Sequence, residues 1–143
     1  MASFTQAPSA SPVSVSVWTG RVLSGLAAAF LLVDAGTKLV APGFAAANSP
    51  EIGWSLDPVT LRTLGALLLV PTLLYIWPRT ALLGAILITG YLGGAIATHL
   101  RIGSPLLTHT LFGVYLALMV WGGLYLRSPQ LRALLPLASF RTD

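Results

Sequence analysis

Four long apolar runs, each bounded by charged or helix-breaking residues, dominate the pattern of the chain. The clearest run is Thr80–Thr98, which contains no charged residue. A membrane-spanning helix needs about 20 predominantly apolar residues, so a run of this length is long enough to cross a bilayer. The same pattern predicts four spanning helices, at about residues 19–40, 59–77, 80–100 and 106–126.

The connections between these runs predict how the helices are arranged. Short turns at 77–79 and 101–105 predict antiparallel neighbours, whereas residues 41–58 form the long internal loop. Residues 1–18 carry no charge and predict a disordered lead, and residues 138–143 form a short tail. The expected fold is therefore all-α: an integral membrane four-helix bundle over residues 19–137 with short loops and both termini on the same side.

Composition excludes a soluble fold. Apolar residues make up 55% of the chain, charged residues only 8%, and the mean hydropathy is +0.82. Soluble domains carry about 25% charged residues.

A cleaved signal peptide starting near Arg21 is the alternative interpretation of the first run, but Asp34 and Lys38 would interrupt the approach to its cleavage site. A retained first helix is favoured.

Basic residues lie singly at the ends of the apolar runs, so they indicate membrane anchors and not a nucleic-acid surface. The lipid bilayer is therefore the expected partner. Lys and Arg are more frequent on the side that holds the two termini, and this excess predicts cytoplasmic termini in a bacterial inner membrane.

The chain has no cysteine, which excludes disulfides, Cys-x-x-Cys redox relays and cysteine-ligated clusters.

Several polar side chains are predicted to lie at a common depth. Counted from the arginine at the terminal side of each helix, Asp34, Lys38, His99 and His109 lie about 20, 25, 30 and 27 Å into a core of about 30 Å. Ionisable groups within a membrane are candidates for function by default. The candidate ligand-binding residues are Asp34, Lys38, Tyr91, His99, Arg101 and His109.

Each of these features has a purely structural alternative. Asp34 and Lys38 lie one helical turn apart and could simply neutralise each other and fix the first helix in place. Gly90 and Gly94, extended by Thr98, predict either close helix packing or a groove that admits a ligand, and packing is the favoured interpretation. Two histidines without a further ligand do not predict a metal site, and no hydrolase or phosphate-binding motif is present.

Three segments carry a resemblance to a known family: FLLVDAGTKLV, LVPTLLYIWPRTALLGAILITGYLGGAIATHLRIGSPLLTHTLFGVYL and WGGLYLRSPQLRALLPL. Together they resemble the DoxX-like family of small four-helix integral membrane proteins over Arg21–Leu137. The family's namesake is described as a membrane subunit of a thiosulfate:quinone oxidoreductase or of a terminal quinol oxidase. The positions that match the family's polar pattern are Asp34, Lys38, Arg79, Tyr91, His99, Arg101 and His109.

Two hypotheses of function follow. In the first, the protein binds a quinone or another lipophilic molecule and is at most the membrane subunit of an oxidoreductase, working with a redox partner subunit or as a homo-oligomer. In the second, it is a non-enzymatic structural or assembly protein that docks a partner. A transporter is disfavoured because four short helices leave little room for a pathway.

Overall fold

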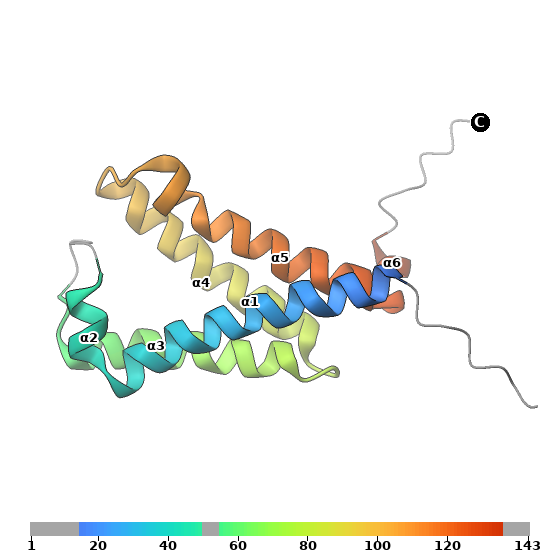
Figure 1. The fold of residues 1–143 in the computed structure, drawn as a ribbon, viewed down its shortest axis with the longest axis horizontal. Helices are drawn as coiled ribbons and strands as arrows, with labels where there is room; N and C mark the ends of the chain where they lie inside the picture. Colours follow the sequence, from blue (N-terminus) through green and yellow to red (C-terminus); the bar gives the residue numbers. More distant parts are fainter. Residues whose placement is uncertain (1–14, 50–54, 136–143) are drawn as a thin grey trace, which may run out of the picture.

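The computed structural model describes residues 15–49 and 55–135, and every regular element in these ranges is helical. The long helices are α1 (Val15–Val40), α3 (Pro58–Ile76), α4 (Ala81–Arg101) and α5 (Phe112–Arg127) (Figure 1). With the π-helical turn η1 (Leu106–Thr110) added to α5, four helices are long and apolar enough to cross a membrane. The expected all-α fold with four candidate spans is confirmed.

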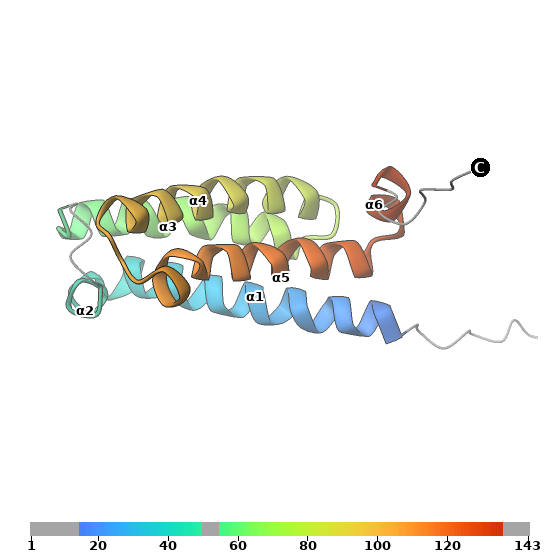
Figure 2. The ribbon, with the colours of Figure 1, turned by 90° about the horizontal axis from the view of Figure 1, so that it is seen from above.

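The two ends of the molecule differ. The first turn of α1 and the short helix α6 (Pro129–Leu134) lie at one end, named here the α6 end. The other end, named the η1 end, holds η1 together with the short helix α2 (Pro42–Ala47) (Figures 1 and 2). The start of α1 and the last helix, α6, therefore lie at the same end of the molecule, as four antiparallel spans require.

Three details depart from the expected segments. α1 already includes Val15, four residues before the predicted start, so part of the expected lead is helical. The long loop contains α2, whose first residue is Pro42, a position where the missing N–H costs no hydrogen bond. The fourth span divides into η1 and α5. The expected tail at 138–143 and most of the expected lead lie outside the described residues.

Asp57 caps the start of α3. Its Oδ1 accepts hydrogen bonds from the backbone N–H groups of Val59 (2.9 Å) and Thr60 (3.0 Å), and its Oδ2 accepts one from the Thr60 hydroxyl (2.6 Å). The Thr60 hydroxyl, followed by the Thr60 N–H, stabilises the carboxylate and lowers the pKa of Asp57 from 3.8 to about 2. The charged form of Asp57 therefore fixes the N-terminus of α3.

This lowered pKa predicts a defined acid sensitivity. The stabilisation from Asp57 is fully present above its unfolded pKa of 3.8 and is lost as the pH falls toward about 2. Thermal unfolding in detergent between about pH 5 and pH 2 should show a steeper loss of stability in the native chain than in Asp57→Ser, whose hydroxyl caps without titrating. Identical slopes for the two chains would show that the titration of Asp57 does not contribute to stability.

Glycines bring three helix pairs into backbone contact. A Cβ atom added to Gly84 of α4 would lie 2.3 Å from the backbone nitrogen of Tyr75 in α3. One added to Gly20 of α1 would lie 2.8 Å from the Gly123 carbonyl of α5, and one added to Gly65 of α3 would lie 2.9 Å from a carbonyl of α1. Small residues allow such approach between membrane helices. The pair α4 and α5 also approaches closely, because a Cβ atom added to Gly113 of α5 would lie 2.8 Å from the Ile96 side chain and 3.4 Å from the Leu92 carbonyl of α4.

A buried cluster of polar groups joins three helices near the α6 end. The Tyr75 side chain is 1% exposed, and its hydroxyl donates to the Val120 carbonyl at 2.9 Å and lies 2.8 Å from the Ser24 hydroxyl. These bonds join α3, α5 and α1. The Arg127 guanidinium lies over the Tyr75 ring at 5.1 Å and donates to the Tyr75 carbonyl at 3.3 Å. Polar contacts and the glycine contacts at Gly20 and Gly84 therefore hold α1 to α5 and α3 to α4 at the α6 end, while the members of each pair part toward the η1 end (Figure 1).

Candidate ligand-binding site

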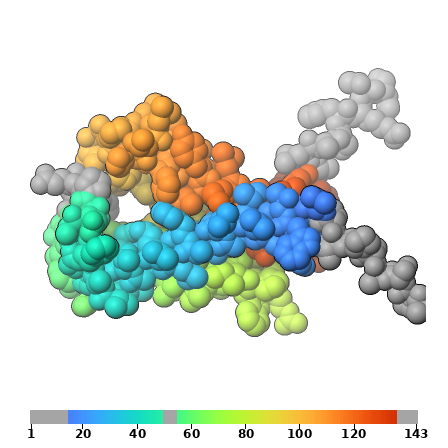
Figure 3. Space-filling model, viewed as in Figure 1, coloured from blue at the N-terminus to red at the C-terminus, as the bar shows by residue number. Residues whose placement is uncertain are grey.

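A cavity of about 430 Å³ lies where the helices part, toward the η1 end. Its walls come from the second half of α1, the first half of α3, the second half of α4 and the start of α5. Figure 3 shows the surface hollowed between α1 and the η1–α5 segment, with α4 behind. The apolar part of the wall includes Phe30, Leu31, Leu68, Leu92 and Leu116.

Five of the six predicted site residues line this cavity. Asp34 and Lys38 come from α1, Tyr91 and His99 from α4, and His109 from η1. Arg101, the sixth, does not line it: Arg101 is the last residue of α4, and its side chain is exposed beyond the wall. The structure therefore places the polar groups of three separate segments around one space.

Asp34 and Lys38 form an ion pair within α1. The Lys38 ammonium lies 2.5 Å from Asp34 Oδ2, and the Lys38 side chain is the more buried of the two, at 16% exposure against 36%. Each residue neutralises the other on the same helix face. Among the described residues of the wall there is no further Asp, Glu, Lys or Arg. The cavity is polar at one end yet carries no net charge when its histidines are neutral.

The two histidines approach each other from different segments. Their ring centroids lie 5.9 Å apart with an angle of 59° between the planes. His99 Nδ1 lies 3.0 Å from the Ser104 hydroxyl, and His109 Nδ1 lies 2.8 Å from the Thr108 hydroxyl. A ring held at Nδ1 presents Nε2 on its other side, where it can donate or accept depending on the tautomer. The pair can therefore hydrogen-bond a carbonyl or hydroxyl group.

The π-helical turn η1 sets the position of His109. The N–H groups of both His109 and Thr110 reach back to the Pro105 carbonyl, at 3.1 and 3.3 Å. This widened turn follows Gly103, whose φ of 68° reverses the chain after α4. π-Helical turns within α-helices are frequent at functional sites. Within residues 15–49 and 55–135, no group of three or more His, Cys, Asp or Glu side chains gathers that could hold a metal ion.

Gly90 and Gly94 open the cavity and do not pack against a helix of this chain. A Cβ atom on either glycine would meet no atom within 4 Å, and both residues line the cavity. Of the two interpretations of this pattern, close packing against another described helix of the chain is wrong, because both glycines face the cavity and not a neighbouring helix. The close contact belongs instead to Gly84, farther toward the α6 end.

The model of one protein family matches residues 22–123, which hold all six predicted site residues and most of the four spans. The chain belongs to the DoxX-like family. The resemblance seen in the sequence is therefore confirmed, and the protein is an integral membrane protein with four candidate spans. Comparison with curated proteins and with solved structures gives no match.

The cavity of this DoxX-like protein is also lined by residues that the sequence analysis did not predict. Phe30 and Phe112 both line it and meet edge to face, with ring centroids 5.2 Å apart. Ser49, after α2, adds a hydroxyl to the polar part. The helical period could have found the two aromatics, because Phe30 lies four residues before Asp34 and Phe112 lies three after His109.

Proposed function

We propose that this DoxX-like protein binds a neutral lipophilic molecule with a polar head group, such as a quinone, in the cavity toward the η1 end. The observation that carries the proposal is the cavity itself, a mostly apolar space of about 430 Å³ with seven polar side chains at its wall. Ligand sites are typically about 300–1,000 Å³, mostly apolar, with a few converging polar groups.

The charges of the wall favour a neutral head group. Asp34 and Lys38 already neutralise each other, so an anionic or cationic ligand would lack an unpaired counter-charge among the described wall residues. The two histidines and Tyr91 supply hydrogen bonds without fixed charge. Quinone carbonyls accept such hydrogen bonds, and the hydroxyls of the quinol both donate and accept them.

The apolar body of the ligand lies along Phe30, Leu116 and the open faces of Gly90 and Gly94 in this proposal. Because the surface is hollowed between α1 and the η1–α5 segment, the body extends through this opening toward the lipid, and the ligand gains access from the bilayer (Figure 3). The protein supplies binding and orientation, and a partner subunit supplies the electrons when the ligand is a quinone. The proposed setting is a bacterial inner membrane with the α6 end cytoplasmic.

Removing both imidazoles tests the role of the histidines. In His99→Ala/His109→Ala, a short-chain ubiquinone titrated into the detergent-solubilised chain should bind about 5- to 150-fold more weakly, since each of two lost hydrogen bonds costs about 0.5–1.5 kcal/mol. Tryptophan fluorescence quenching gives the affinity, and thermal unfolding verifies the fold. Tyr115→Phe on the outer, exposed face of α5 is the control and should bind as the native chain does. Unchanged affinity in the folded double variant argues against the histidines as ligand contacts.

An assembly role is the second candidate. It is favoured by the Asp34–Lys38 pair, because two charges that neutralise each other on one helix need no ligand to be stable in the membrane. In that case a partner protein is retained at a fixed ratio after mild extraction from native membranes, and no small molecule is.

A further inference from the structure

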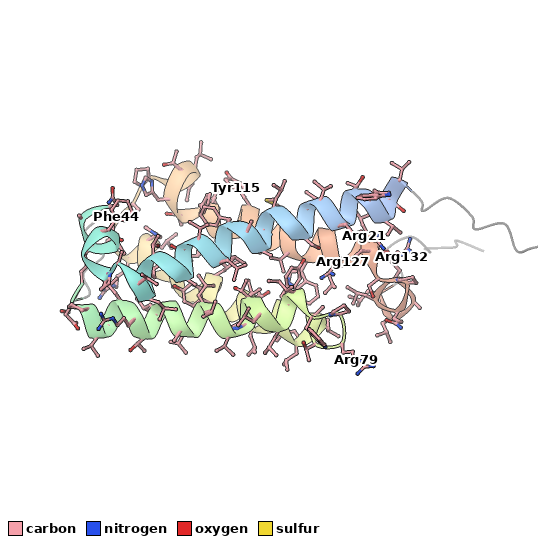
Figure 4. All side chains as sticks on the ribbon, turned by 60° about the horizontal axis from the view of Figure 1, so that its bottom comes forward. Arg21, Phe44, Arg79, Tyr115, Arg127 and Arg132 are labelled. Carbon is pink, nitrogen blue, oxygen red and sulfur yellow. The ribbon has the colours of Figure 1, made fainter. Side chains whose placement is uncertain are left out.

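Four arginines gather at the α6 end, each from a different element. Figure 4 shows Arg21 of α1, Arg79 of the turn between α3 and α4, Arg127 of α5 and Arg132 of α6 at this end. The two described carboxylates, Asp34 and Asp57, belong to the opposite part of the molecule, late in α1 and before α3. The arginine end, defined by these four arginines, is therefore strongly basic within the part of the chain that the structure describes.

Packing holds two of these arginines in place. The contact between Gly20 and Gly123 brings α1 and α5 together so closely that a Cβ on Gly20 would also lie 2.8 Å from the Arg127 backbone nitrogen. The backbone of Arg21, the next residue, therefore lies near the last turn of α5, whereas its side chain is exposed. The Arg21 guanidinium lies 5.7 Å from the Trp18 ring centre, and that of Arg127 lies over Tyr75.

Arg127 carries a donor that the protein does not use. Its Nε is buried and has no hydrogen-bond partner among the described residues, although its Nη2 donates to the Tyr75 carbonyl. Guanidinium groups bind phosphate through several parallel N–H donors. Protein atoms enclose this Nε, so a phosphate would bind the other N–H groups of Arg127, whose side chain is only partly buried.

Apolar side chains around the arginines place this end at the depth of lipid head groups. Leu131 anchors α6 in the core at 6% exposure, whereas Leu134 of the same helix is 72% exposed. Trp18 and Trp77, at the same end, are 58% and 63% exposed. Exposed tryptophans and a short helix with leucine and arginine are typical of the membrane interface.

We infer that the arginine end binds the phosphates of anionic phospholipids. Charge complementarity selects the occupant, because an anionic head group supplies both the net negative charge and the oxygen acceptors that the four arginines need. The binding surface lies at the opposite end from the cavity, so it does not depend on the proposed ligand function.

The test compares two lipids with the same acyl chains, phosphatidylglycerol and phosphatidylcholine, by native mass spectrometry of the full chain in mild detergent. The native chain should retain phosphatidylglycerol preferentially, and added salt should weaken this preference. Arg79→Gln/Arg132→Gln should lower the retention about fivefold for each arginine. Arg62→Gln, which removes an exposed arginine at the opposite end, is the control and should leave it unchanged.

Equal retention of the two lipids overturns the inference, as does an equal loss in the Arg62→Gln control. The source of the phosphate is tested by thermal unfolding with inorganic phosphate against chloride at the same ionic strength. The midpoint should rise with phosphatidylglycerol and stay constant with inorganic phosphate. An equal rise with both assigns the surface to free phosphate and also overturns the inference.

Discussion

Gly84→Ala should destabilise the protein severely although it adds a single methyl group. The new Cβ would lie 2.3 Å from the Tyr75 nitrogen and 2.5 Å from its Cα, and both are backbone atoms that cannot rotate away. α4 would have to move off α3 and strain the Tyr75 hydrogen bonds to α1 and α5. We expect a loss of about 3 kcal/mol, at the upper end of the usual cost of overpacking.

Thermal unfolding in mild detergent measures this effect, with Gly93→Ala as the matched control. Gly93 lies on the same helix, and a Cβ there would meet no atom within 4 Å. Because alanine favours a helix over glycine by up to about 1 kcal/mol, Gly93→Ala should be neutral or slightly stabilising. Equal unfolding midpoints for the two variants would contradict the close contact between α3 and α4.

Gly94→Leu should abolish ligand binding while the fold survives. Gly94 lines the cavity, and its Cβ position is open, so a leucine side chain has room to enter without displacing the backbone. The side chain would then occupy the space that we assign to the apolar body of the ligand. Affinity for a short-chain ubiquinone should fall by more than about tenfold, equivalent to at least about 1.4 kcal/mol.

Gly93→Leu is the matched control for this second experiment. Gly93 is equally open but does not line the cavity, so its leucine points elsewhere on α4. The control should bind the ubiquinone as the native chain does, and both variants should keep their unfolding midpoints. A folded Gly94→Leu protein with native affinity would show that the ligand does not use this cavity.

The sequence predicts the span that contains these glycines, but it does not predict which atoms each glycine meets. The absence of charge over Thr80–Thr98 is sufficient to place a span there, because burial of charge in lipid is costly. The sequence cannot tell that Gly84 contacts another helix while Gly94 faces a cavity, since both are glycines within one apolar helix. That difference depends on where α4 diverges from its neighbours.

The candidate site was partly predictable, because the sequence sets how deep a side chain lies in the membrane but not which way it points. Rise per residue sets the depth of a side chain, and the four site residues placed by depth all line one cavity: Asp34, Lys38, His99 and His109. Depth does not set the direction of a side chain, and Arg101, the last residue of α4, does not line the cavity although it follows His99 by only two residues. The π-helical turn that positions His109 has no distinct sequence signal, and the Tyr75 cluster joins residues far apart in the chain.

The most direct test of the account is the identification of what the protein holds when it leaves its own membrane. The native chain and Gly94→Leu are extracted in mild detergent under the same conditions, and bound small molecules are identified by ultraviolet spectroscopy and mass spectrometry. We predict a lipophilic molecule with a neutral polar head in stoichiometric amount in the native chain and its loss in Gly94→Leu. The absence of any such molecule from the folded native chain, or equal retention by both chains, would contradict the account.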